Sequence, residues 1–310
     1  MTKIEFQNFP HDFNSASNFI IDIFSEITKR DARFSNFISD NTFLVSNCYT
    51  QKNLLKKAIN RIQAEFRQSA MTQWLQLQQG FEVPTEGYSK RLWMTFENRR
   101  PVSGSFQRTL SFDLDDFSGS NLYLPLWALY IDFLENGANW VRHQIRQEDL
   151  FGSRVLPDHF QEKKFLCAFI NNPEPTRIRA LLELSKIGTV DIFGRYSGNY
   201  VKDKIEVSKN YRFSMCFEND LYPGYVTEKP LEAWLGETIP LYWGDDSGGY
   251  LNPNCLINLK TFSNLNEFIN YVALINSSSE LYARTYVEPF LRKKFDKEEL
   301  ISFFSQWIGE

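Results

Sequence analysis

The stretch from Phe213 to Gly244, FSMCFENDLYPGYVTEKPLEAWLGETIPLYWG, decides the fold. It begins and ends with short apolar runs that have the length and composition of β-strands. Between them, Thr227 is a suitable helix N-cap, Pro230 suits a first helical turn, and Gly236 suits a helix end. The pattern predicts a β-α-β unit with two parallel strands.

Polar and charged side chains gather where the first of these strands leads into the helix. They are Glu218, Asn219, Tyr225, Glu228 and Lys229. In parallel α/β units, ligands bind beyond the carboxyl ends of the strands, against the N-terminus of the following helix. A cation beside free helix N–H groups suits a phosphate, and a carboxylate suits sugar hydroxyls. The junction is therefore typical of a site for a sugar nucleotide.

The composition indicates a folded protein of ordinary solubility. A length of 310 residues allows two domains of about 150 residues each. With 43% hydrophobic residues, 28 of them Phe, disorder is excluded. The net charge of -4 gives no reason to expect nucleic acid as a partner. No apolar run reaches the roughly 18 residues of a membrane span, and no signal-peptide core opens the sequence. We expect a cytoplasmic protein, with peripheral association at the inner face of the membrane left open.

The cysteines and histidines favour structural roles. The sequence contains four scattered cysteines, Cys48, Cys167, Cys216 and Cys255. Three of them lie in apolar, strand-like runs. Buried free thiols are favoured over disulfides or a metal site. Of the three histidines, His11 is remote in sequence from His143 and His159, which disfavours a histidine metal site.

Alternating elements predict an α/β fold in two parts. For the first half the patterns predict strands at 3–6, 42–46 and 92–96, helices at 16–29 and 52–77, and two further segments at 111–117 and 122–130. For the second half they predict strands at 165–170, 189–193, 213–217, 239–243 and 255–259, and helices at 175–186, 265–275, 280–292 and 297–307. A charged stretch at 146–164 suggests a linker, giving domains 1–150 and 151–310.

Three motifs, FEN, GYVTEK and IPLYWG, resemble in their order and spacing the signature of the α-1,3-fucosyltransferases, glycosyltransferase family 10. The resemblance covers most of the chain and is strongest from Lys164 to Asn258. It is nearest to bacterial members. It implies a GT-B-like fold, in which two Rossmann-like domains face each other across a cleft. The first would bind the acceptor and the second the GDP-sugar, with the last helix packing back on the first domain.

The resemblance also assigns roles. The segment TFENRRP, 95–101, is similar to the family segment that carries the proposed catalytic base, which makes Glu97 the base here. Phe96 stands where the family usually has Gly. This departure from the family pattern bears on the local backbone geometry. Glu97 also follows the apolar strand predicted at 92–96, so it should lie at the carboxyl end of that strand, facing the cleft.

The same resemblance implies a donor site in the second domain. Arg195 and Lys229 would bind the diphosphate, and Glu228 the ribose hydroxyls. Asn219 and Tyr225 would line the pocket, while Glu218 has either a binding or a structural role.

A metal-dependent alternative rests on FDLDDF, which resembles the Asp-x-Asp metal site of GT-A enzymes through Asp113, Asp115 and Asp116. This run lies in the first half, and family 10 enzymes carry a similar run without a catalytic metal. We therefore expect no metal and no cofactor besides the donor. The sequon at Asn276 is interpreted as chance, because no secretory signal accompanies it.

These inferences predict an inverting α-1,3-fucosyltransferase that moves L-fucose from GDP-fucose to a hydroxyl, O3 of GlcNAc or glucose, on a glycan. By analogy the product belongs to glycan biosynthesis, such as protein glycosylation or a bacterial lipopolysaccharide. Two alternatives stay open: a different donor sugar or linkage in the same fold, and a carbohydrate-binding protein without catalysis. The insertion at 52–90 leaves the acceptor undefined.

Overall fold

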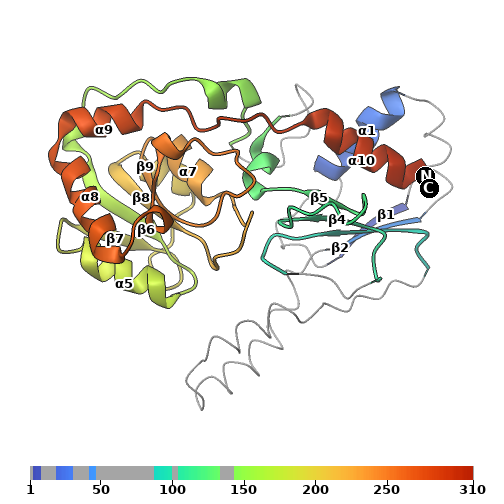
Figure 1. Ribbon diagram of the computed structural model, residues 1–310, viewed down its shortest axis with the longest axis horizontal. Helices are drawn as coiled ribbons and strands as arrows, with labels where there is room; N and C mark the ends of the chain where they lie inside the picture. Colours follow the sequence, from blue (N-terminus) through green and yellow to red (C-terminus); the bar gives the residue numbers. More distant parts are fainter. Residues whose placement is uncertain are drawn as a thin grey trace, which may run out of the picture. The chain divides into compact units, whose positions relative to one another are not determined.

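The computed structural model describes residues 3–7, 19–30, 42–46, 87–99, 104–132 and 143–309. The chain divides into two compact units. Unit 1 comprises Met1–Gln144 together with Asp296–Glu310, and unit 2 comprises Ile145–Phe295. Each unit contains one five-stranded sheet whose paired strands are all parallel (Figure 1).

The sheet of unit 1 has the spatial order β1-β2-β3-β4-β5. Its strands are β1 (Lys3–Gln7), β2 (Thr42–Ser46), β3 (Lys90–Met94), β4 (Arg108–Ser111) and β5 (Asn121–Tyr123). Its helices are α1 (Phe19–Arg30), α10 (Lys297–Gly309) and a 3-10 helix (Leu126–Tyr130).

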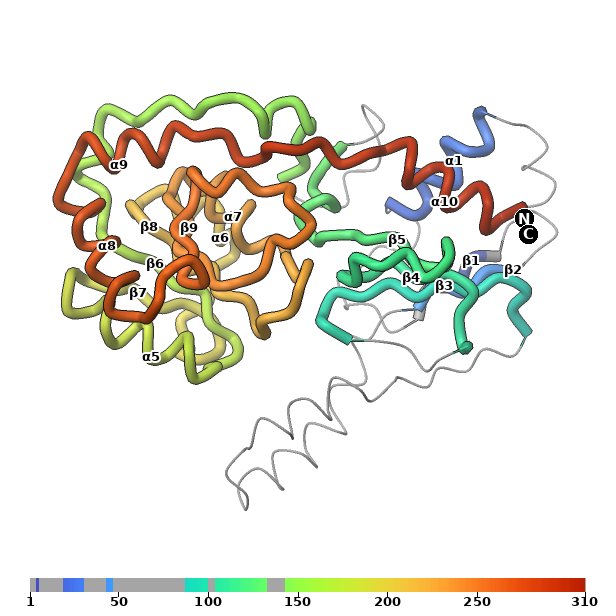
Figure 2. The backbone as a smooth tube through the Cα atoms, viewed as in Figure 1, coloured from blue at the N-terminus to red at the C-terminus, as the bar shows by residue number. Residues whose placement is uncertain are grey.

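The last helix, α10, completes the core of unit 1. In Figure 2, α10 lies beside α1 although the two come from opposite ends of the chain. The Trp307 ring is fully buried, with its centroid 5.6 Å from that of Phe43 and 6.2 Å from that of Phe24. The buried Lys90 donates from Nζ to the carbonyl of Trp307 at 2.9 Å. Unit 1 therefore depends on residues that follow unit 2 in the sequence.

Unit 2 has the spatial order β10-β9-β8-β6-β7. Its strands are β6 (Lys164–Phe169), β7 (Val190–Phe193), β8 (Tyr211–Phe217), β9 (Ile239–Trp243) and β10 (Ile257–Asn258). Its helices are α5 (Pro175–Leu184), α6 (Lys204–Ser208), α7 (Lys229–Leu235), α8 (Leu265–Ser277) and α9 (Ser279–Tyr286). Its 3-10 helices are Gln147–Phe151, Phe160–Glu162, Pro253–Cys255 and Leu259–Thr261.

Helices cover both faces of this sheet. Helices α5 and α8 pack together on one face, and α6 and α7 pack together on the other (Figure 1). Because both faces are covered, the central strands are continuous apolar runs, as in β9, IPLYW. The chain runs from β6 out to β7 and then crosses to β8 on the other side of β6. This reversal is a topological switch point, where α/β proteins bind ligands beyond the strand ends.

Most predicted elements of unit 2 are confirmed within a few residues, but two predictions are wrong and one helix was missed. The strand predicted at 255–259 is reduced to β10, flanked by 3-10 turns. The helix predicted at 280–292 ends at Tyr286, shortly before Pro289, which cannot donate a helical N–H. The short helix α6 was not predicted.

In unit 1, the segment predicted at 111–117 is not one element, because β4 ends at Ser111. The carboxylates of Asp115 and Asp116 accept the backbone N–H groups of Phe117 and Ser118 at 2.7 and 3.0 Å. Phe117 and Ser118 have φ values of 47° and 59°, which a strand does not allow. The helix predicted at 52–77 lies outside the described residues.

The thiols of Cys167, Cys216 and Cys255 are free and buried, as predicted; Cys48 lies outside the described residues. Across the described ranges, no helix combines the length and apolarity that crossing a bilayer requires.

We expect the substitution Trp307→Ala to destabilise unit 1 by about 3 to 5 kcal/mol, because it removes a fully buried ring from an aromatic cluster. Chemical denaturation of the full chain measures this cost. The control Gln306→Ala changes an exposed neighbour on the same helix and should cost far less. Equal costs for the two variants would show that α10 is not part of the core.

Candidate functional site

The predicted donor residues of unit 2, apart from Arg195, follow the carboxyl end of β8. The loop from Glu218 to Glu228 joins β8 to α7, and two backbone hydrogen bonds tie it to the end of β9 and to the segment that follows β9. The Glu218 N–H donates to the Trp243 carbonyl at 2.9 Å, and the Gly224 N–H donates to the Asp245 carbonyl at 3.1 Å. The loop is thus held along the carboxyl edge of the sheet, next to the switch point.

The centre of this site is the carboxylate of Glu218, which has no solvent exposure. Its Oε2 accepts from Lys229 Nζ at 2.7 Å and from the Thr227 hydroxyl at 2.8 Å. Its Oε1 accepts from the Thr227 backbone N–H at 2.8 Å and from the Tyr242 hydroxyl at 3.4 Å. Burial raises the pKa of Glu218, and the Lys229 ammonium and the Thr227 N–H oppose that rise because they bind the ionised carboxylate.

Lys229 belongs to the same cluster, and its side chain reaches the surface of the protein. Its side chain is 24% exposed, and its Nζ also donates to the Thr227 hydroxyl at 3.0 Å. Burial lowers the pKa of Lys229, but the carboxylates of Glu218 and Glu228 outweigh burial and raise that pKa above its ordinary value. The ammonium therefore stays charged at neutral pH.

Arg177 connects the ends of the two strands at the switch point. It extends from α5, is 4% exposed, and donates to the carbonyls of Asn172, Phe217 and Glu218 at 2.6, 2.7 and 3.0 Å. Its Nη2 also donates to Asn219 Oδ1 at 3.2 Å. One guanidinium thus fixes the segment after β6, the end of β8 and a predicted donor residue.

Arg195 lies on an exposed tight turn after β7. Its backbone N–H donates to Asn171 Oδ1 at 3.0 Å, which ties the turn to the segment after β6. Gly194 has φ +98°, and a Cβ there would lie 2.8 Å from the Ile170 carbonyl oxygen, so the position requires glycine. The turn holds Arg195 at the carboxyl edge that also carries Lys229.

The other predicted donor residues differ in exposure. Asn219 and Glu228 are half-buried, whereas Tyr225 is 1% exposed and belongs to the interior. The prediction of Thr227 as the N-cap of α7 is wrong: the cap is Glu228 and the helix begins at Lys229. The Thr227 hydroxyl instead bonds to the Glu218 carboxylate, an acceptor whose full charge attracts the hydroxyl hydrogen.

The predicted base, Glu97, belongs to unit 1 and is half-buried. It lies beyond the carboxyl end of β3. The Thr95 hydroxyl bonds to the Glu97 carbonyl, the Glu97 N–H lies 3.3 Å from that hydroxyl, and the Arg99 N–H donates to the same carbonyl at 2.6 Å. A tight turn therefore fixes the backbone that carries the Glu97 carboxyl group.

The acidic run at 113–116 has local partners. Asp113 is buried and bonds to Ser111, and the next two carboxylates close the turns described above. Within the described part of the chain, no group of three or more His, Cys, Asp or Glu side chains could hold a metal ion.

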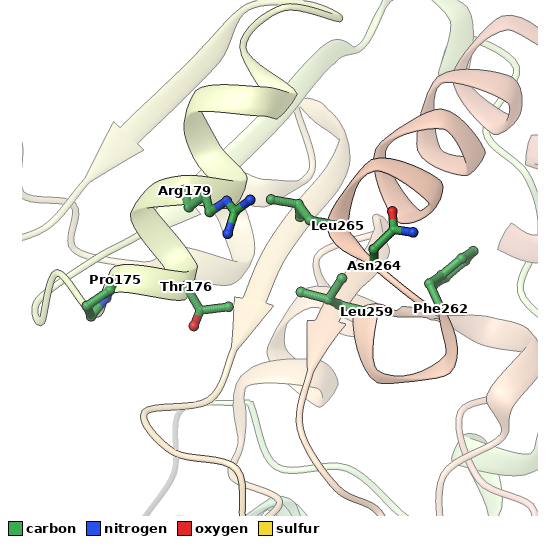
Figure 3. A pocket seen from close by; sticks show the side chains of 7 residues that line it. All are labelled: Pro175, Thr176, Arg179, Leu259, Phe262, Asn264 and Leu265. Atoms are coloured by element: carbon green, nitrogen blue, oxygen red, sulfur yellow. The ribbon is translucent and has the colours of Figure 1, made fainter. Parts of the chain in front are cut away.

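A separate cavity of about 380 Å³ lies between the first turns of α5 and α8 (Figure 3). It is lined by Pro175, Thr176, Arg179, Leu259, Phe262, Asn264 and Leu265. None of the predicted site residues lines it, and its walls are largely apolar.

Sequence reasoning did not find the role of Arg177, although a signal for it exists. The buried positions of α5 are Arg177, Ala180, Leu181 and Leu184, which follow a helical spacing of three, four and seven residues. An arginine on the apolar stripe of a helix must find buried acceptors. Such a position therefore indicates a structural arginine that spans neighbouring elements.

The comparisons with known proteins agree on one family. Residues 160–301 match the model of the C-terminal domain of glycosyltransferase family 10 (fucosyltransferase), a range that includes all three motifs. An alpha-(1,3)-fucosyltransferase of Helicobacter pylori, FucT, is 31% identical over 221 residues, which are 63% of this chain and 46% of that protein. The human 4-galactosyl-N-acetylglucosaminide 3-alpha-L-fucosyltransferase 9 is 28% identical over 128 residues, 39% of this chain and 36% of that protein. The chain thus spans less than half the length of these relatives.

The solved structures show the fold. A crystal structure of an alpha1,3-fucosyltransferase with GDP has a TM-score of 0.63 and 20% identity, covering all of this chain and 90% of that one. A second, with GDP-fucose, has a TM-score of 0.60 and 19% identity. The predicted GT-B-like α/β fold is confirmed.

The loop after β9 carries a carboxyl group that should make stability depend on pH. Asp246 accepts the N–H groups of Leu251 and Tyr250 at 2.8 and 3.3 Å, and burial raises the pKa of Asp246 to about 6. Its folded pKa then exceeds its unfolded value, so the folded state binds more protons between about pH 4 and pH 6. Its contribution to stability is lost as pH rises through that window.

We expect the wild-type chain to lose about 2 to 3 kcal/mol more stability than Asp246→Asn between about pH 4 and pH 6.5. Denaturant unfolding at several pH values measures the difference. Glu280→Gln, which removes an exposed carboxyl group of the same unit, should follow the wild type. Parallel curves for Asp246→Asn and the wild type contradict the assignment.

Proposed function

Because residues 160–301 match the model of the glycosyltransferase family 10 C-terminal domain, we propose that this chain transfers L-fucose from GDP-fucose to a hydroxyl of a glycan acceptor. The observation that carries the proposal is the cluster of Glu218, Thr227 and Lys229 at the switch point of that domain. It presents a charged ammonium where nucleotides bind in α/β sheets. The reaction is proposed to invert the anomeric centre in a single displacement.

In that displacement, the acceptor oxygen forms a bond to C1 of fucose while the bond from C1 to the β-phosphate oxygen of GDP breaks. The acceptor proton passes to the carboxylate of Glu97, and the electron pair of the broken bond leaves with GDP. Glu97 is therefore proposed as the general base. A single base suffices, because inversion involves no covalent intermediate.

The donor is proposed to bind to unit 2. Lys229 and Arg195 stabilise the charge that develops on the departing diphosphate. Glu228 accepts hydrogen bonds from the ribose hydroxyls. Asn219, held by Arg177, contacts the nucleotide, and the buried Tyr225 supports the pocket from the interior.

The acceptor is proposed to be a glycan that offers O3 of GlcNAc or glucose. Supporting this class, the human relative is named as a 4-galactosyl-N-acetylglucosaminide 3-alpha-L-fucosyltransferase. The transfer is proposed to need no metal ion, because two cationic side chains, rather than a metal, would balance the charge of the diphosphate.

Calorimetric titration with GDP, GDP-fucose, GDP-mannose and UDP-glucose, all in EDTA, tests the donor. We expect binding of GDP and GDP-fucose and no binding of UDP-glucose. Preference for GDP-mannose or a uridine nucleotide would overturn the fucose assignment while keeping the fold. Binding of none of the four would favour a carbohydrate-binding protein, and binding only after EDTA is replaced by Mn²⁺ or Mg²⁺ would overturn metal independence.

We expect Glu97→Gln to lower the rate of fucose transfer by about 100-fold to 10,000-fold, because the amide cannot accept the acceptor proton. GDP affinity should stay close to that of the wild type. Initial rates with a GlcNAc-terminated acceptor and GDP titrations measure the two effects. The control Glu299→Gln removes an exposed carboxylate of the same unit. Wild-type turnover in Glu97→Gln rules out Glu97 as the base.

A further inference from the structure

We infer that Glu218 is a positioning residue for the diphosphate: it fixes the Lys229 ammonium through a direct ion pair and through Thr227, and leaves one N–H of Lys229 for a phosphate oxygen. The inference rests on the proposed function and deepens it. It assigns a role to the one charged residue of the FEN motif, for which the sequence left binding and structural roles open.

The hydrogen bonds of Lys229 define what it can still bind. An ammonium has three N–H donors. One is directed to Glu218 Oε2 at 2.7 Å and one to the Thr227 hydroxyl at 3.0 Å. The described residues supply no acceptor for the third, and the side chain is 24% exposed. The free donor is therefore available at the surface while the other two set its direction.

Glu218 is suited to this role because both its backbone and its side chain are anchored. Its N–H donates to the Trp243 carbonyl, and its own carbonyl accepts from Arg177. The side chain has no exposure, so its carboxylate cannot contact a phosphate itself. A buried carboxylate of this kind acts on the nucleotide only through the groups it holds, Lys229 and Thr227.

The Thr227 hydroxyl links the two charges. A hydroxyl donates one hydrogen and accepts through its lone pairs. Here it donates to the Glu218 carboxylate and accepts from Lys229 Nζ, which fixes the ammonium from a second direction. The arrangement replaces side-chain rotation of Lys229 by a single geometry and reduces the entropy lost when a phosphate binds.

The surrounding charges predict how the cluster responds to pH. The charged groups that act on Lys229 are Glu218 from β8, Glu228 before α7 and Arg177 from α5; the Tyr242 hydroxyl from β9 contacts Glu218. Burial and Arg177 lower the pKa of Lys229, and the two carboxylates raise it. Without the Glu218 charge, only Glu228 opposes the lowering of the Lys229 pKa by burial, so Lys229 should lose its proton at a lower pH.

The test measures GDP affinity in EDTA at about pH 7, 8 and 9 for four variants and the wild type. The variants are Glu218→Gln, Lys229→Met, the double variant and Asp191→Asn. Asp191→Asn is the matched control: it removes a carboxylate that pairs with Lys164 at 2.9 Å and accepts from the Tyr211 hydroxyl at 2.6 Å, near the amino ends of β6, β7 and β8 and away from the site.

We expect the wild type and Asp191→Asn to bind alike at each pH. Glu218→Gln should bind about tenfold more weakly at pH 7, with a deficit that grows with pH until it equals that of Lys229→Met. The double variant should bind no more weakly than Lys229→Met, because Glu218 acts through that lysine. The inference is overturned if the double variant binds GDP more weakly than Lys229→Met. It is also overturned if the GDP affinity of Glu218→Gln changes with pH in parallel with that of the wild type.

A second pair of variants tests the same cluster if Glu218→Gln does not fold. Thr227→Val removes the linking hydroxyl and should weaken GDP binding about threefold to tenfold, and Thr227→Ser should restore it. Equal affinities for the two overturn the inference. If the wild-type chain does not bind GDP, the proposed function is overturned. If the wild type binds GDP and Glu218→Gln binds it as tightly as Asp191→Asn does, only the inference is overturned.

Discussion

The site of unit 2 depends on the hydrogen bonds and the ion pair made by the Glu218 carboxylate, which is fully buried. A buried charge is tolerated only when donors surround it, and Thr227, Lys229 and Tyr242 all direct hydrogen bonds to it. Meeting that requirement brings the end of β8, the start of α7 and strand β9 together. The same requirement leaves a charged ammonium at the surface of the carboxyl edge.

The order of the strands explains why this edge is available. In unit 2 the chain reverses direction between β6 and β8, so the segments that follow these strands lead to opposite faces of the sheet. The ends of both strands are then left uncovered by their own helices. Arg177 spans them and donates hydrogen bonds to three carbonyl oxygens at these ends.

The two units obtain their stability in different ways. Unit 2 is continuous in sequence, and its core lies between the sheet and helices α5 and α8. Unit 1 is not continuous, because α10 returns to it after unit 2 and contributes Trp307 to a cluster with Phe24 and Phe43. A variant within α10 is thus expected to act on the unit that bears Glu97, although α10 follows unit 2 in the chain.

The sequence alone determined the parallel α/β character, the strand-helix-strand unit at 213–244 and the residue types at its junction, because hydrophobic period, capping residues and breakers act over short distances. It did not determine that β4 ends at Ser111, since the turn after it depends on which carboxylate reaches which N–H. Nor did it determine the roles of Arg177 and Glu218. Their partners lie up to 42 residues away in the sequence, and only folding brings those acceptors and donors within hydrogen-bond distance.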